Sequence, residues 1–207
     1  MKNLIKYLKD FNSKERFFLV GEILGNPNFK ISSEFRGKLS DLLEIQIPSD
    51  AFSAMDFHID WLNASLNLAK DNDITKVYPN NNVIKGQQED VDWLIAFNVK
   101  NEYHIVLIEA KGVTGWANKQ MTSKAKRFVN IFGEQGKRWP SVVPHFVMMS
   151  SLQTQGLNLE EWPQWMAPNG KVKWLELPIP KSLKYVYRCD DKGHKNKDGQ
   201  SWKIGER

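Results

Sequence analysis

Two short apolar runs lie near the middle of this chain. Residues 91–97 (VDWLIAF) contain a single acid, and residues 104–108 (HIVLI) are followed directly by Glu109-Ala110-Lys111. A run of four large aliphatic residues indicates a strand buried on both faces, because a half-exposed strand alternates apolar with polar residues. The pattern therefore predicts two central strands, joined through the polar residues 98–103.

The charged residues of these two strands are spaced so that they should cluster. Residues two apart on a strand project to one face, so Glu109 and Lys111 are expected to emerge side by side. If a tight turn at Lys100-Asn101 joins the strands, facing residues have numbers that sum to 201, and Asp92 faces Glu109. Carboxylates about 5 Å apart repel each other, and a divalent cation between them would convert that cost into a binding site.

An acid, a hairpin and then Glu-x-Lys at the end of an apolar strand resemble the PD-(D/E)XK nuclease superfamily. The matching residues are Asp92, Glu109 and Lys111, although Val91 stands where a proline often precedes the first acid. The resemblance implies an α/β, restriction-endonuclease-like αβββαβ core that hydrolyses DNA phosphodiesters with Mg²⁺, for which Mn²⁺ can substitute. Asp92, Glu109 and the Ala110 carbonyl would hold the metal, and Lys111 would orient or deprotonate the attacking water.

Residues 50–70 are predicted to form one mostly buried helix before the sheet. Its narrow polar stripe carries two acids, Asp56 and Asp60, at helical spacing. Because the superfamily often takes an acid from such a helix, the resemblance makes Asp60 the first choice for a further metal ligand and Asp56 the second. An ordinary solvated stripe explains the same residues equally well.

The remaining segments complete the predicted architecture. Val83-Ile84 is expected to belong to a first, edge strand, residues 116–132 to a helix, and residues 146–149 to a fourth strand. Residues 191–200 are expected to form the polar tip of a hairpin. The whole chain is predicted to be one domain, with a helical part at 1–48, a nuclease-like core at about 50–150 and a C-terminal β-hairpin extension at about 170–207.

The net charge of +5 is distributed unevenly along the chain. Residues 116–138 carry +5 and residues 181–207 carry +4, so the remainder carries −4. Basic surfaces over an acidic centre suit DNA whose backbone approaches a metal, although solvated helix and tail lysines are the simpler explanation. The expected phosphate-contacting residues are Lys119, Lys124, Lys126, Arg127 and Lys195, and Gln120 is expected to touch the phosphate or the water.

Composition narrows the remaining choices. A single cysteine, Cys189, excludes an intrachain disulfide, and no apolar run is long enough to cross a membrane. We therefore expect a soluble cytoplasmic protein that binds DNA and no membrane, with a homodimer left open. The leading function is a metal-dependent DNA endonuclease. The alternative is a catalytically inactive nucleic-acid-binding or protein-interaction module of the same fold, in which Glu109 and Lys111 form only an ion pair.

Overall fold

The chain divides into two compact units, Met1–Glu176 and Leu177–Arg207, and each is described here by itself. No helix in the described part of the chain combines the length and the apolar content that a membrane crossing requires. The computed structural model describes residues 1–26, 29–86, 89–153, 156–180 and 182–206.

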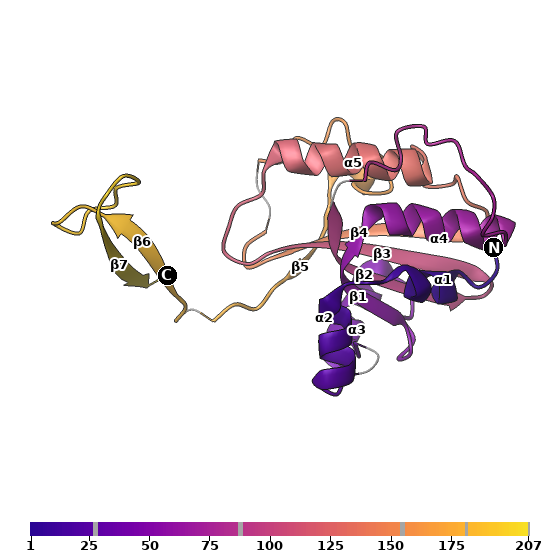
Figure 1. The fold of residues 1–207 in the computed structure, drawn as a ribbon, viewed down its shortest axis with the longest axis horizontal. Helices are drawn as coiled ribbons and strands as arrows, with labels where there is room; N and C mark the ends of the chain where they lie inside the picture. The colour runs from indigo at the N-terminus through magenta and orange to yellow at the C-terminus, as the bar shows by residue number, and fades with distance from the viewer. Residues whose placement is uncertain (27–28, 87–88, 154–155, 181, 207) are drawn as a thin grey trace. The chain divides into compact units, whose positions relative to one another are not determined.

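The first unit is built on a five-stranded mixed sheet with the strand order β1-β2-β3-β4-β5 (Figure 1). An antiparallel meander forms one half of it, from β1 (Phe52–His58), β2 (Asp90–Val99) and β3 (Glu102–Lys111). Strands β4 (Val142–Ser150) and β5 (Lys173–Glu176) extend the other half in parallel with β3. The sheet and its helices confirm the predicted α/β class.

The β2–β3 hairpin has the predicted register. Its paired residues begin with Trp93 opposite Ile108, and all have numbers that sum to 201. Residues 100–101 form a two-residue turn in which both φ angles are positive, as in the type I′ turn that matches the natural twist of a hairpin. One further step along this register places Asp92 opposite Glu109, so their side chains belong to the same face of the sheet.

Helices cover that face of the sheet, as Figure 1 shows. Helix α5 (Asn118–Phe132) and helix α4 (Ile59–Asp71) both pack on it, and α1 (Leu4–Phe11) lies against α4. The apolar residues of α5 enter the core as the period of 3.6 predicts, because they share one face of the helix. They are Met121, Ala125, Phe128 and Ile131.

The segment 50–70 corrects the sequence prediction. Its first part is the edge strand β1 instead of the start of a helix, and Val83-Ile84, predicted as the edge strand, lies outside any strand. A long apolar segment fits both periods, so burial alone did not distinguish strand from helix. The backbone at His58 is extended (φ −65°, ψ 131°), and its ring accepts the N–H of Asp60, so His58 is the cap at which α4 begins.

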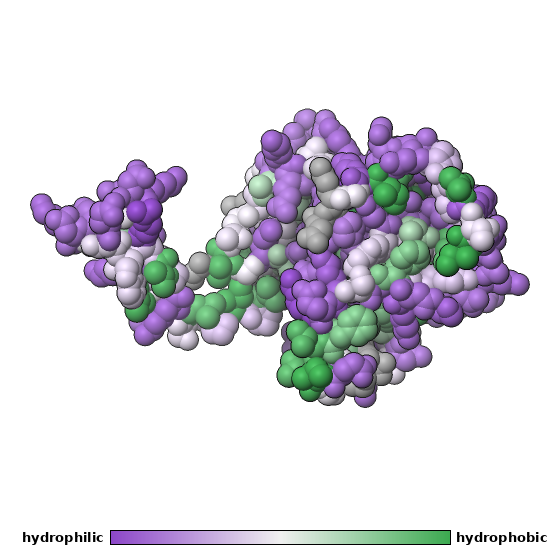
Figure 2. All heavy atoms as spheres, in the orientation of Figure 1, coloured by the Kyte–Doolittle hydropathy of each residue, from purple (hydrophilic) through white to green (hydrophobic). Residues whose placement is uncertain are grey.

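Helix α3 (Ser33–Leu43) lies near the other face, on the side of Trp93. It carries Phe35, whose ring centre is 5.0 Å from that of Trp93 on β2. Helix α2 (Glu15–Phe18) continues into the π-helical turn η1 (Leu19–Ile23). Figure 2 shows an apolar patch over this part of the unit. The exposed apolar side chains of this region are Phe18, Leu19, Ile23 and Leu24.

The second unit is the predicted β-hairpin. Strand β6 (Lys184–Cys189) pairs antiparallel with β7 (Ser201–Glu206), and a polar segment connects them. Gly199 closes this connection against the backbone of Cys189. A Cβ atom added to Gly199 would lie 2.0 Å from the Cys189 carbonyl oxygen, so only glycine fits this position without a shift of the main chain.

A histidine pair joins β3 and β4. His104 Nδ1 lies 3.0 Å from His145 Nε2, and the ring of Phe97 stacks on His104. Burial lowers the pKa of His104, and burial together with the charge of His104 lowers the pKa of His145 to about 3. Both rings are therefore neutral in the folded protein at pH 7, and one donates a hydrogen bond to the other.

We predict that acid destabilises the protein through this pair. Unfolded imidazoles bind protons near pH 6.5, whereas the folded His145 ring does so only near pH 3, so the free energy of unfolding should fall as the pH falls from about 6.5 towards 3. The slope from His145 should reach about 1.4 kcal/mol per pH unit, and the lowered pKa of His104 acts in the same direction. Denaturant unfolding of wild type and His145→Gln between pH 4 and 7 measures the difference. His194→Gln, at the exposed hairpin tip, is the control, and an equal pH dependence in His145→Gln would contradict the assignment.

Candidate functional site

The two acids of the hairpin meet where β2 begins and β3 ends, below α5. Asp92 Oδ2 accepts the backbone N–H of Ala110 at 2.7 Å, so its carboxylate reaches across to β3 beside Glu109. The charge of Asp92 also raises the pKa of Glu109, as expected for two neighbouring carboxylates. The hairpin register thus brings the first two predicted site residues together.

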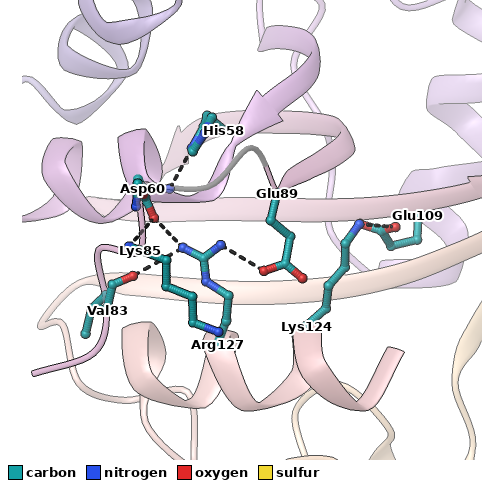
Figure 3. A network of polar contacts seen from close by, with 9 residues as sticks. His58, Asp60, Val83, Lys85, Glu89, Glu109, Lys124 and Arg127 are labelled. Atoms are coloured by element: carbon teal, nitrogen blue, oxygen red, sulfur yellow. Dashed lines mark hydrogen bonds and ion pairs between the residues drawn. The ribbon is translucent and has the colours of Figure 1, made fainter. Parts of the chain in front are cut away.

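Glu109 is the most enclosed of the predicted site residues. Its exposed fraction is 1%, and the Lys124 ammonium lies 2.5 Å from both carboxylate oxygens, as Figure 3 shows. Burial raises the pKa of Glu109 to about 7, which the positive charges of Lys124 and Lys111 oppose. Removal from water is therefore the dominant effect on this carboxyl group, and positive charge beside it stabilises the ionised form.

Lys111 completes the predicted trio. It follows Glu109 by two residues on β3 and so shares its face of the sheet. The ammonium lies 5.8 Å from the centre of the Trp116 ring, and its charge acts on the pKa of Glu109. Lys111 is partly buried, in contrast to Lys124, which is almost completely buried. The side chain is therefore positioned beside the acid pair while part of it contacts solvent.

Asp60 belongs to a second cluster, centred on Arg127. The Arg127 guanidinium is 2% exposed and donates to Asp60 and, at 2.8 Å, to Glu89. It also donates to the Val83 carbonyl, while Asp60 accepts the N–H of Gly86 at 3.0 Å. Figure 3 shows this cluster and the Lys124–Glu109 pair side by side along α5, with Asp60 and Glu109 at opposite ends. Asp60 is thus committed to Arg127 and to the loop before β2.

The register brings Asp56 toward the acid pair instead. Its neighbours on β1 pair with the neighbours of Asp92 on β2, so Asp56, Asp92 and Glu109 occupy one row across three strands. Asp56 has a left-handed backbone (φ 50°) in the middle of its strand, and its carboxylate forms an ion pair with Arg16. Strained backbone of this kind is concentrated at functional sites, and here it occurs at an acid in the row of Asp92 and Glu109.

The donor atoms at this edge are of the type that a hard cation binds. Asp92, Glu109 and the Ala110 carbonyl offer oxygen, the donor that Mg²⁺ and Mn²⁺ prefer, and water or phosphate oxygens usually complete such sites. The Lys124 ammonium shows that Glu109 accepts a cation on both of its oxygens. Among the described residues, no three His, Cys, Asp or Glu side chains converge to hold a metal ion. The residues fit a metal held by two carboxylates, with few protein ligands.

The residues expected to contact DNA fall into two groups. Lys119, Gln120 and Lys126 are exposed on α5, and Lys195 is exposed at the hairpin tip, where its ammonium lies 4.8 Å from the Tyr185 ring centre. The other two, Lys124 and Arg127, are buried in the ion pairs described above and face the sheet.

The sequence held a signal for this difference between the α5 cations. Lys124 lies three residues after the inward-facing Met121 and four before the inward-facing Phe128. That spacing places Lys124 on the apolar face of the helix. The prediction of DNA contacts counted the charges of the segment and did not use the position of each lysine in the helical period. It therefore did not separate Lys124 from the exposed lysines.

Comparison of the chain with protein-family models, with curated proteins and with solved structures found no match.

We predict that Lys124 stabilises the fold by neutralising Glu109. Lys124→Met should lower the free energy of unfolding by about 3–5 kcal/mol, because a buried carboxylate loses its nearest cation. Lys126→Met is the matched control on the same helix, where an exposed pair with Glu161 should contribute less than about 1 kcal/mol. The double variant Lys124→Met/Glu109→Gln should recover part of the loss in denaturant unfolding, and strictly additive losses would show that the two side chains are not coupled.

Proposed function

We propose that this chain is a metal-dependent nuclease that hydrolyses phosphodiester bonds in DNA. The observation that carries the proposal is the hairpin register, which sets Asp92 opposite Glu109 with Lys111 two residues further along the same strand. Two carboxylates and an amine at the adjoining ends of two central strands would supply metal ligands and a group that contacts phosphate or water. Burial of Glu109 favours a bound cation, because the ionised carboxylate has lost its hydration.

Each residue has a distinct role in this proposal. Asp92, Glu109 and the Ala110 carbonyl would hold Mg²⁺ or Mn²⁺, which when bound stabilises negative charge on the phosphate and lowers the pKa of water. Lys111 donates hydrogen bonds to a phosphate oxygen and orients the attacking water. Neither acid of the predicted stripe joins this pair as a third ligand in the proposal, because Arg127 holds Asp60 and Arg16 holds Asp56.

Exposed polar and basic side chains in each unit, taken separately, are the candidate contacts with DNA phosphates. Lys119, Gln120 and Lys126 occupy the solvent side of α5, above the helix face whose Lys124 contacts Glu109. Lys195 in the second unit sits over the rings of Tyr185 and Tyr187, a combination of cation and aromatic groups that suits phosphate and bases. Lys124 and Arg127 have no part in phosphate contact here, because their charges are already neutralised by buried carboxylates.

A second candidate function is a non-catalytic DNA-binding module of the same architecture. The contact that favours it is the Lys124 ammonium, which engages both oxygens of Glu109 and so competes with a metal. In this alternative the acid pair only anchors α5 to the sheet, and the basic surface alone has a function. The two candidates differ in one measurement, which is cleavage of DNA in the presence of a divalent metal.

We predict that Lys111→Ala reduces metal-dependent DNA cleavage by a factor of about 10² or more. The loss should occur without unfolding, because Lys111 lies at the end of its strand and is only partly buried. Gel assays on single-stranded, duplex and branched DNA with Mg²⁺ or Mn²⁺ measure the rate, and circular dichroism checks the fold. Lys9→Ala, an exposed lysine on α1, is the control that should cleave like wild type.

The outcome of this assay separates the two candidates. Cleavage by wild type that Lys111→Ala retains in full would place the chemistry elsewhere or in a contaminant. Absence of cleavage by wild type on every DNA form would leave the binding module as the better description.

We predict that DNA binding is salt-dependent and uses Lys119, Lys126 and Lys195. Each lysine that contacts a phosphate contributes about 0.7–0.9 to the slope of log K against log salt. Charge reversal at any one of them should weaken binding and reduce the slope by nearly this amount in fluorescence anisotropy. Lys2→Glu, exposed before α1, is the control, and a slope unchanged in all three variants would show that these lysines are only solvated.

A further inference from the structure

A cavity of about 850 Å³ lies in the first unit next to the α4–α5 pair. Its wall combines α4, the loop at 78–84, the end of α5 and the segment 138–140. This volume lies within the range of sites that bind small molecules. Helix α4 contributes to the wall through Asn63 and Asn67.

The lining has a distinct chemistry. Asn63, Asn67 and Asn130 bring side-chain amides, each of which both donates and accepts hydrogen bonds. Tyr78 and Trp139 bring aromatic rings, and Lys70 and Arg138 bring positive charge. None of the described residues in the lining is an Asp or Glu. The cavity therefore suits a ligand that is anionic, has a flat ring and carries both donors and acceptors.

The Trp139 ring is held in a fixed position. It is 8% exposed, and its indole N–H donates to the Ile131 carbonyl at 2.7 Å. Tyr78, in contrast, comes from the loop and is only partly buried, and the Lys76 ammonium lies 5.3 Å from its ring centre, so a ligand would stack on the opposite face of the ring. Asparagine amides match the hydrogen-bonding edges of nucleobases, and aromatic rings stack on their faces.

We infer that this cavity binds an unpaired nucleotide of a nucleic-acid strand. The inference deepens the proposed nuclease function, on which it rests for the identity of the strand. A base can enter a cavity only when it has left the stack, so the substrate carries a single-stranded or flipped-out nucleotide. Tyr78 stacks on the base, the asparagine amides bond its edge, and Lys70 and Arg138 neutralise the phosphates beside it.

The position of the cavity fits this use. Asn130 follows Lys124 by six residues on α5, which is about 9 Å along the helix axis. That length corresponds to roughly three stacked nucleotides at about 3.4 Å each. A strand with one phosphate at the Asp92–Glu109 edge thus has a base within reach of the cavity a few nucleotides away.

Fluorescence anisotropy with a labelled single-stranded oligodeoxynucleotide in EDTA tests the inference, with a blunt duplex of the same composition as the second probe. Tyr78→Leu should weaken binding of the single strand by about fivefold or more, the loss of one stacking contact. Lys70→Glu should also weaken it. The control is Lys9→Glu, because Lys9 and Lys70 are both exposed lysines in the last turn of a helix, and only Lys70 lines the cavity.

Each outcome of this test has a defined meaning. Selective loss of single-strand binding in Tyr78→Leu and Lys70→Glu, with little change for the duplex or for Lys9→Glu, upholds the inference. Unchanged single-strand affinity in Tyr78→Leu overturns it, as does an equal loss for both probes, which would indicate backbone contacts only. Because no metal is present, these results are independent of cleavage. If wild type cuts DNA and Tyr78→Leu binds the single strand normally, only the cavity inference is refuted. If Tyr78→Leu loses single-strand binding and wild type does not cut DNA, only the nuclease proposal is refuted.

Discussion

The register of one hairpin determines where the chemically important side chains of this protein lie. A two-residue turn at 100–101 fixes the pairing of β2 and β3, and a slip by one residue would send Glu109 to the opposite face of the sheet. The same register turns Glu109 toward Lys124 on α5. The pairing of β1 with β2 then places Asp56 beside Asp92. Sheet geometry, rather than any single contact, therefore brings three acids into one row.

The acid row creates an electrostatic cost that the fold offsets with buried cations. Glu109 has lost nearly all contact with water, and its pKa of about 7 reflects that loss. Lys124 supplies positive charge from the helix above, and one turn later Arg127 does the same for Asp60 and Glu89. The buried face of α5 is thus apolar except at Lys124 and Arg127, the two positions where it meets acids. This division lets α5 close the core without leaving an unpaired carboxylate.

The sequence predicts the parts of the fold in which local pattern and burial agree. The central strands and the strand at 146–149 are short apolar runs, and the helix over 116–132 has one clear period, so each pattern indicates a single structure. Residues 50–70 fit two periods, since their apolar residues satisfy both a strand and a helix, and only the cap at His58 shows the division. The pairing of Asp92 with Glu109 could be predicted because the position of the turn fixes which residues face each other. The cavity could not be predicted, because its wall combines segments far apart in the chain.

The ion pairs of α5 also constrain the order in which the protein can fold. Arg127 meets Asp60 across 67 residues and Glu89 across 38, whereas Lys124 meets Glu109 across 15. A guanidinium that entered the core before these acids were in place would be a buried, uncompensated charge. Complete docking of α5 therefore waits until α4, the loop before β2 and the β2–β3 hairpin have assembled. Because contacts between residues distant in sequence form more slowly than local ones, we expect the β2–β3 hairpin to form before α5 docks completely.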